Sequence, residues 1–238
     1  MSKPKSSLYT FQFALIICVI CSFLLALVSE GLRSKKELNR EMDIKRNILK
    51  VVDLAEPLPK KAGVATIKNI YDEKIQEAVI DPEGNIVEGR IPSSIEEGEK
   101  LYPLFIYEEN GNKKAYAFPI IGKGLWSTLY GYLSLEPDAV TVRGLTFYQH
   151  GETPGLGAEI EKDWFTDNFK GKKIWDIKEL KLEPVAVVKG KVEDKIPTGE
   201  RDHYVDGISG ATMTSKGVTE MVDRELRKYE PYFSKVRK

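Results

Sequence analysis

The 238-residue sequence has little of what metal sites usually require. It contains two cysteines and two histidines, and both cysteines lie in one apolar run near the N-terminus. The rest of the chain therefore cannot form a disulfide or a cysteine-ligated metal site, and two histidines are too few to indicate a histidine-rich metal centre. The 36 basic and 36 acidic residues balance, so no excess of positive charge indicates a nucleic-acid partner.

Two common nucleotide-binding fingerprints are also missing. No glycine-rich stretch ends in the Gly-Lys-Ser/Thr of a Walker P-loop, and no Gly-x-Gly-x-x-Gly pattern opens a predicted helix. The sequence therefore offers no recognisable site for a dinucleotide such as NADH. No group of residues is typical of a catalytic acid or base, so we predict no complete active site on this chain.

The longest apolar run is residues 8–28. As a helix, about 21 residues extend roughly 31 Å, which is enough to span the hydrocarbon core of a bilayer. A cleaved signal peptide is the alternative, but the run is long and Ala26-Leu27-Val28 is a poor cleavage site. We predict a cytoplasmic segment at 1–7, a transmembrane helix at 8–28, a juxtamembrane helix or linker at 29–52, and a domain at 53–238. Lysines and arginines flank both ends of the run, so charge does not decide its orientation.

Cys18 and Cys21 lie one helical turn apart in this run. One interpretation is a thiol pair, or ligands of a cluster shared between neighbouring subunits. The other is that two small, polarisable side chains pack in lipid.

The remaining chain predicts an α+β domain with an antiparallel or mixed sheet flanked by helices. Asn110-Gly111 marks a hairpin between two apolar segments. We expect a helix at 160–169, and strands at 78–80, 86–87, 104–107, 115–121, 129–135, 140–148 and 185–192.

The most informative stretch is 206–215, which reads Asp-Gly-Ile-Ser-Gly-Ala-Thr-Met-Thr-Ser. Apolar residues recur at helical spacing after it, and Pro231 predicts the end of that helix. The hydroxyls of Thr212, Thr214 and Ser215 therefore lie where a helix begins, a position that suits a phosphate group. The alternative is that Ser209 or Thr214 caps the helix and the glycines only turn the chain.

Two further glycine-containing segments precede this stretch. Residues 122–127 read Gly-Lys-Gly-Leu-Trp-Ser, and residues 150–157 read His-Gly-Glu-Thr-Pro-Gly-Leu-Gly. The second is either a wall of the same site or a surface turn. Lys189, Lys191, Lys195 and Arg201 are either solvated or attract an anionic ligand to the site.

In this order, the three segments resemble those of the FMN-binding domain family. The resemblance covers roughly Asn47 to the C-terminus. It implies FMN bound covalently through a phosphoester to Thr212, the threonine after Gly210 and Ala211. A separate flavin transferase moves FMN from FAD onto that hydroxyl in this family, and Asp206 and Gly207 match the part of the motif that the transferase needs.

The resemblance also implies the other cofactor-binding residues. Ser209 and Thr214 lie beside the attachment point. Three residues of the second segment, Glu152, Thr153 and Leu156, lie beside the flavin, and Leu125 and Trp126 help to form its pocket. An apolar wall with a few polar groups suits a flavin ring.

Leu-Trp-Ser and the segment Lys45–Leu49 favour the branch of the family that serves Na+-translocating NADH:quinone oxidoreductases. The alternative branch is the G subunit of the Rnf ferredoxin:NAD oxidoreductase. Either resemblance implies an electron-transfer subunit with other membrane subunits as partners, anchored in a bacterial inner membrane with its domain on the periplasmic face. Two other classes remain open: a membrane-anchored binding or assembly module without a redox role, and a flavoenzyme with its own substrate.

Overall fold

The computed structural model describes residues 7–54, 63–177 and 179–237. Contacts divide the chain into two units, 1–44 and 45–238. The first unit contains helix α1 (Ser7–Gly31) and the beginning of α2 (Arg33–Val51). Within residues 8–31 of α1, an 18-residue window reaches a mean hydropathy of 2.8, so the helix is long and apolar enough to cross a membrane. The prediction of one N-terminal apolar helix is confirmed, whereas residues 1–6 lie outside the described part of the chain. Cys18 and Cys21 are both free.

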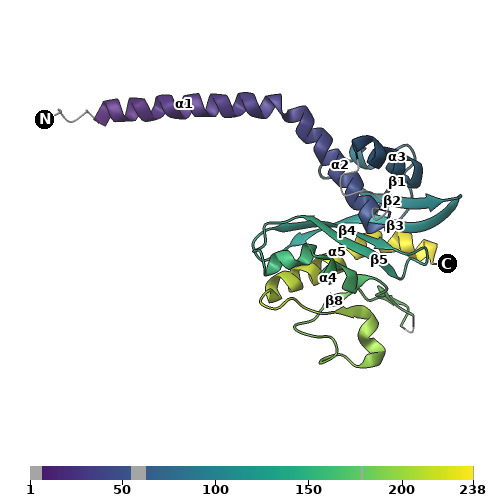
Figure 1. The fold of residues 1–238 in the computed structure, drawn as a ribbon. Coiled ribbons are helices and arrows are strands. Elements are labelled where there is room, and N and C mark those ends of the chain that lie inside the picture. Colours follow the sequence, from purple (N-terminus) through teal and green to yellow (C-terminus); the bar gives the residue numbers. More distant parts are fainter. Residues whose placement is uncertain (1–6, 55–62, 178, 238) are drawn as a thin grey trace. The chain divides into compact units, whose positions relative to one another are not determined.

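The second unit is built on a five-stranded sheet (Figure 1). Each strand pairs antiparallel with the next along the chain, so the sheet is a meander. This confirms the predicted α+β class with an antiparallel sheet. The strands are β1 (Ile75–Ile80), β2 (Tyr102–Glu109), β3 (Asn112–Lys123), β4 (Thr128–Leu135) and β5 (Val142–Gln149).

The β2–β3 hairpin forms at the dipeptide that predicted it. Glu109 pairs with Asn112, which leaves a two-residue loop. Asn110 and Gly111 both have positive φ, at 52° and 74°. A type I′ turn requires this at both central positions, and asparagine and glycine adopt it readily.

Apolar residues bury both faces of the sheet. Successive side chains of a strand point to opposite faces, so Leu104 and Ile106 join one core while Phe105 faces the other side. The first face packs against α5 (Thr212–Val236), as Figure 1 shows. The other face is covered by α3 (Val64–Lys74) and by the last turns of α2, where Ile48 and Leu49 are fully buried.

Helix α5 does not end at Pro231, as the sequence predicted, but continues to Val236. A proline inside a helix removes one hydrogen bond and crowds the preceding turn. Here the turn that contains it buries Tyr232 and Phe233, and the Phe233 ring lies 5.6 Å from that of Phe118. Burial of these rings outweighs the lost hydrogen bond, so the helix is preserved.

Three other predicted elements are shorter or interrupted in the structure. The segment 160–169 is not one helix, because Lys162 is extended and separates two short turns. Residues 86–87 form only an isolated bridge, and the strand predicted at 185–192 is reduced to β8. The short elements are η1 (Pro92–Ser94), η2 (Gly157–Glu161), α4 (Asp163–Thr166), η3 (Asp167–Phe169), β6 (Trp175–Asp176), β7 (Lys181–Leu182), β8 (Ala186–Val187), η4 (Thr198–His203) and β9 (Tyr204–Val205).

Gly217 allows α5 to approach the end of β3 closely. A Cβ at this position would lie 2.1 Å from the backbone oxygen of Lys123. Glycine-to-alanine in a helix normally adds about 1 kcal/mol of stability, but here the clash forces backbone movement that costs roughly 2–3 kcal/mol. We therefore expect Gly217→Ala to lower the thermal unfolding temperature. The neighbouring exposed change Lys216→Ala should leave that temperature nearly unchanged, and equal behaviour of the two variants would contradict the close approach.

Candidate functional site

The carboxylate of Glu152 joins the three glycine-containing segments. Its Oε1 accepts hydrogen bonds from the backbone N–H groups of Trp126 and Ser127, at 2.9 and 3.1 Å. Its Oε2 accepts one from the backbone N–H of Leu125 at 3.2 Å and one from the hydroxyl of Thr214 at 2.7 Å. Glu152 is 5% exposed. One buried side chain therefore holds together segments that lie up to 62 residues apart.

Glu152 is ionised at neutral pH. Burial opposes its charge, but the hydrogen bonds from Thr214 and from the backbone of Trp126, Leu125 and Ser127 outweigh burial and hold its pKa below the ordinary value. Such charge-assisted bonds are stronger than neutral ones. The carboxylate is thus a fixed structural acceptor and not a proton donor.

Two glycines make room for this carboxylate. A Cβ on Gly124 would lie 2.5 Å from Glu152 Oε1. A Cβ on Gly157 would lie 2.7 Å from the Thr214 hydroxyl and 2.8 Å from Glu152 Oε2. The glycines of the first two segments therefore permit close packing around the carboxylate, which is a role beyond turning the chain.

The two threonines at the start of α5 have different surroundings. Thr212 is the first residue of the helix and is exposed. Thr214 is 1% exposed and its hydroxyl is bound to Glu152. The residue that precedes the helix is Ala211, which has no side-chain oxygen, so neither Ser209 nor Thr214 occupies the capping position. Thr212 is the threonine whose hydroxyl a ligand can reach.

Large apolar side chains lie exposed close to Thr212. Trp126 is 72% exposed, and Leu125, Leu156 and Met213 are between 43% and 57% exposed. The backbone turn at Gly210 brings the chain within contact of Leu156, whose Cδ2 would lie 2.8 Å from an added Cβ. Exposed apolar clusters of this kind mark binding surfaces. Thr153 is also exposed, and its carbonyl accepts the N–H groups of Leu156 and Ala158 at 3.1 Å, which shapes this turn.

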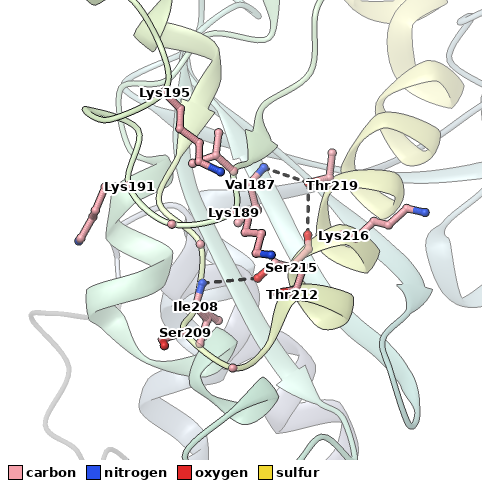
Figure 2. Close-up of a pocket in the computed structure, with 14 residues that line it drawn as sticks. Val187, Lys189, Lys191, Lys195, Ile208, Ser209, Thr212, Ser215, Lys216 and Thr219 are labelled. Atoms are coloured by element: carbon pink, nitrogen blue, oxygen red, sulfur yellow. Dashed lines mark hydrogen bonds between the residues drawn. The ribbon is translucent and has the colours of Figure 1, made fainter.

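A groove of about 590 Å³ reaches Thr212 (Figure 2). Its walls come from the end of β8 and the loop after it, from 207–210, and from the first turns of α5. Lys189, Lys191, Lys195 and Lys216 line it. Arg201, which the sequence grouped with these lysines, instead donates to the backbone oxygens of Ile196 and Glu193.

Asp206 and Gly207 hold the loop after β8, which forms one wall of the groove. Asp206 accepts the backbone N–H of Val192 at 2.8 Å and pairs with Lys191 at 2.6 Å. Burial opposes its charge, but Lys191 and this N–H keep its pKa below the ordinary value. A Cβ on Gly207 would lie 2.1 Å from the backbone oxygen of Val188. Both residues therefore have a structural role in positioning the loop after β8.

Comparison with known proteins decides the family. Residues 124–227 match the FMN-binding domain family. The chain is 31% identical over its whole length to the C subunit of the Na+-translocating NADH-quinone reductase of Pseudomonas aeruginosa, and it covers 99% of that protein. The chain belongs to this family of C subunits.

Other members of the C-subunit family agree in sequence and in fold. The protein from Vibrio alginolyticus is 30% identical over 93% of this chain and 91% of its own length. The crystal structure of the protein from Parabacteroides distasonis superposes with a TM-score of 0.71, at 37% identity, over 85% of this chain and 97% of that one. The match at 124–227 contains the site residues of all three glycine-containing segments.

Sequence reasoning did not identify two residues of this C-subunit site. The hydroxyl of Ser127 donates to Glu152 at 3.3 Å and accepts the N–H of Gly151 at 2.6 Å. The hydroxyl of Thr219 accepts the N–H of Val187 at 2.9 Å, which ties α5 to β8. Ser127 could have been noticed as the last residue of the first segment, whereas Thr219 has no local signal.

The depressed pKa of Glu152 predicts a pH-dependent contribution to stability. The ionised side chain stabilises the fold above its unfolded pKa of about 4.3, and this contribution is lost as pH falls through the lower folded value. We therefore expect the gap in unfolding temperature between the native chain and Glu152→Gln to be widest near neutral pH and to shrink in acid. Thermal unfolding of both at a series of pH values checks this. A gap that stays constant would contradict the assignment.

Proposed function

We propose that this chain carries FMN covalently bound to Thr212 through a phosphoester, and that it serves as an electron-transfer subunit of a Na+-translocating NADH:quinone oxidoreductase. The observation that carries the proposal is an exposed threonine hydroxyl, in the Ser-Gly-Ala-Thr sequence, beside a cluster of exposed apolar side chains. The match to the FMN-binding domain family supports the cofactor. The names of the relatives support the C subunit over the Rnf alternative.

The residues present fit such a group. Thr212 supplies the oxygen of the ester, and the N-terminus of α5 favours the negative charge of a phosphodiester by about 0.3–1 kcal/mol at an exposed position. Noncovalent binding at micromolar affinity requires about 8 kcal/mol, so a covalent bond is what keeps a flavin on so open a surface. Trp126, Leu125 and Leu156 offer apolar contact to a flat ring.

Glu152 acts here through position. By holding the backbone of 125–127 and the hydroxyl of Thr214, it fixes the apolar side chains relative to the start of α5. Thr153, Ser209, Gly210 and Ala211 complete the turn around the attachment point. When bound, FMN supplies the ability to accept and pass on electrons, and the protein around it sets the potential at which it does so.

We assign two kinds of partner to this chain. A flavin transferase attaches the FMN from FAD and recognises the region of Asp206 and Gly207. The other partners are the membrane subunits of the same oxidoreductase, which bind NADH and quinone. We place the chain in a bacterial inner membrane through the apolar helix at 8–28, with the domain on the periplasmic side.

Mass spectrometry of the native protein tests the cofactor. We expect the peptide that contains Thr212 to carry the mass of one FMN joined as a phosphoester with loss of water. An unmodified peptide from chain co-expressed with its transferase would overturn the proposal and favour a binding or assembly module.

Protease treatment of spheroplasts tests the orientation. A protease added outside should digest the 53–238 domain of the membrane-bound chain without lysis of the cells. Digestion only after lysis would place the domain in the cytoplasm.

A further inference from the structure

Thr212 lines a groove whose walls do not include the exposed apolar side chains of the site. The exposed apolar side chains of Leu125, Trp126, Leu156 and Met213 are near it, yet none of them lines the groove of about 590 Å³ that also reaches Thr212. The apolar cluster already accounts for a flavin ring. The groove is therefore available to a second ligand, and its volume of about 590 Å³ is in the range of small-molecule sites, roughly 300–1,000 Å³.

The four lysines of the groove fall into two groups, those that form an ion pair with a carboxylate and those that do not. Lys191 is paired with Asp206 at 2.6 Å and Lys216 with Glu220 at 3.5 Å. In contrast, Lys189 and Lys195 form no ion pair with any residue that the structure describes. Figure 2 shows Lys189 and Lys195 directed into the groove, and Lys191 and Lys216 directed away from it. Two uncompensated positive charges thus point into the groove that leads to Thr212.

The floor beneath these charges is apolar. Val187 and Val188 are half-buried and Ile208 is buried, and all three line the groove. The hydroxyls of Thr219 and Ser215 bind the backbone N–H groups of Val187 and Ile208, at 2.9 and 3.5 Å. An apolar floor beside two ammonium groups suits a ligand that has a flat ring and a phosphate. A concave site also favours a small molecule over the flat surface of a protein partner.

We propose that the groove holds the adenylate half of FAD while Thr212 is being modified. This rests on the proposed attachment of FMN to Thr212. In that reaction the Thr212 oxygen bonds to the phosphorus of the FMN half, and the bond from that phosphorus to the bridging oxygen breaks. AMP leaves with the bridging oxygen and its electron pair, and the hydroxyl proton passes to AMP or to water. No group is oxidised or reduced.

In this arrangement the acceptor chain helps to bind the flavin donor. Lys189 and Lys195 pair with the phosphates of FAD and with the charge that accumulates on the departing AMP. The adenine ring lies on Val187, Val188 and Ile208. The flavin half then lies on the side of Thr212 where the apolar side chains are exposed.

The test measures the rate of flavin attachment to the full-length apo chain in detergent, with purified transferase and FAD. The variant is Lys189→Gln with Lys195→Gln, and the matched control is Lys216→Gln, a lysine of the same groove that points away from it. We expect the double variant to unfold at the native temperature and to reach full loading, but with a KM for FAD raised about tenfold. The KM for the acceptor chain should be unchanged, and the control should match the native chain.

Two results would overturn the proposal. One is an unchanged KM for FAD in the double variant. The other is a raised KM for the acceptor chain alone, which would mean that the lysines bind an acidic surface of the transferase. If instead the proposed function is wrong, the result is different, because the native chain itself would then acquire no flavin on Thr212.

Discussion

Replacing Thr212 with alanine is expected to abolish covalent flavin. The change removes the oxygen that forms the ester, and the nearest other threonine hydroxyl is committed to Glu152 inside the protein. Because Thr212 is exposed, its loss should change stability by no more than about 0.5 kcal/mol. Fluorescence of the denatured chain in a gel, after co-expression with the transferase, measures the effect directly.

Two matched variants make this result specific. Thr212→Ser keeps a hydroxyl at the same backbone position and should retain covalent flavin. Thr214→Val removes the buried hydroxyl and should also retain it, although the fold should be less stable because Glu152 loses a donor. Flavin that persists in Thr212→Ala and disappears in Thr214→Val would transfer the attachment to Thr214.

Replacing Glu152 with alanine is expected to have the largest effect on stability. The change leaves three backbone N–H groups and two hydroxyls without their acceptor. A buried polar group without a partner costs about 1–3 kcal/mol, and water will reach some of these, so we expect a total loss of roughly 3 kcal/mol or more. For a domain of this size that corresponds to a fall of roughly 6–12 °C in unfolding temperature.

Circular dichroism of the full-length chain in detergent follows this unfolding. Glu152→Gln should be intermediate, because an amide oxygen still accepts from the backbone of 126–127 while its NH₂ group can donate to the Thr214 hydroxyl. The exposed carboxylate of Glu220 provides the control, and Glu220→Ala should stay within about 0.5 kcal/mol of the native chain. A Glu152→Ala variant as stable as this control would show that the carboxylate does not hold the segments together.

Local features of the sequence predicted much of the fold. The Asn110-Gly111 hairpin was predictable because only a few residue types adopt positive φ at both positions. The apolar helix at the N-terminus was predictable from length and composition alone. The end of α5 was not, because proline's local preference to stop a helix is outweighed by the burial of Tyr232 and Phe233 against residues more than a hundred positions away.

The sequence by itself determined the class of the site, because the order and the amino-acid sequences of the three glycine-containing segments can be read directly along the chain. The resemblance implied Thr212 as the attachment point but said nothing of its exposure, and the segment 150–157, which contains Glu152, was either a wall of the site or a surface turn. Only the tertiary structure decided that Thr212 is exposed while Thr214 is buried against Glu152. The physical reason is that the accessibility of the Thr214 hydroxyl depends on Glu152, which lies 62 residues away in the chain. The same carboxylate also binds the backbone of Ser127, 25 residues away, and only folding brings these groups within hydrogen-bond range of one another.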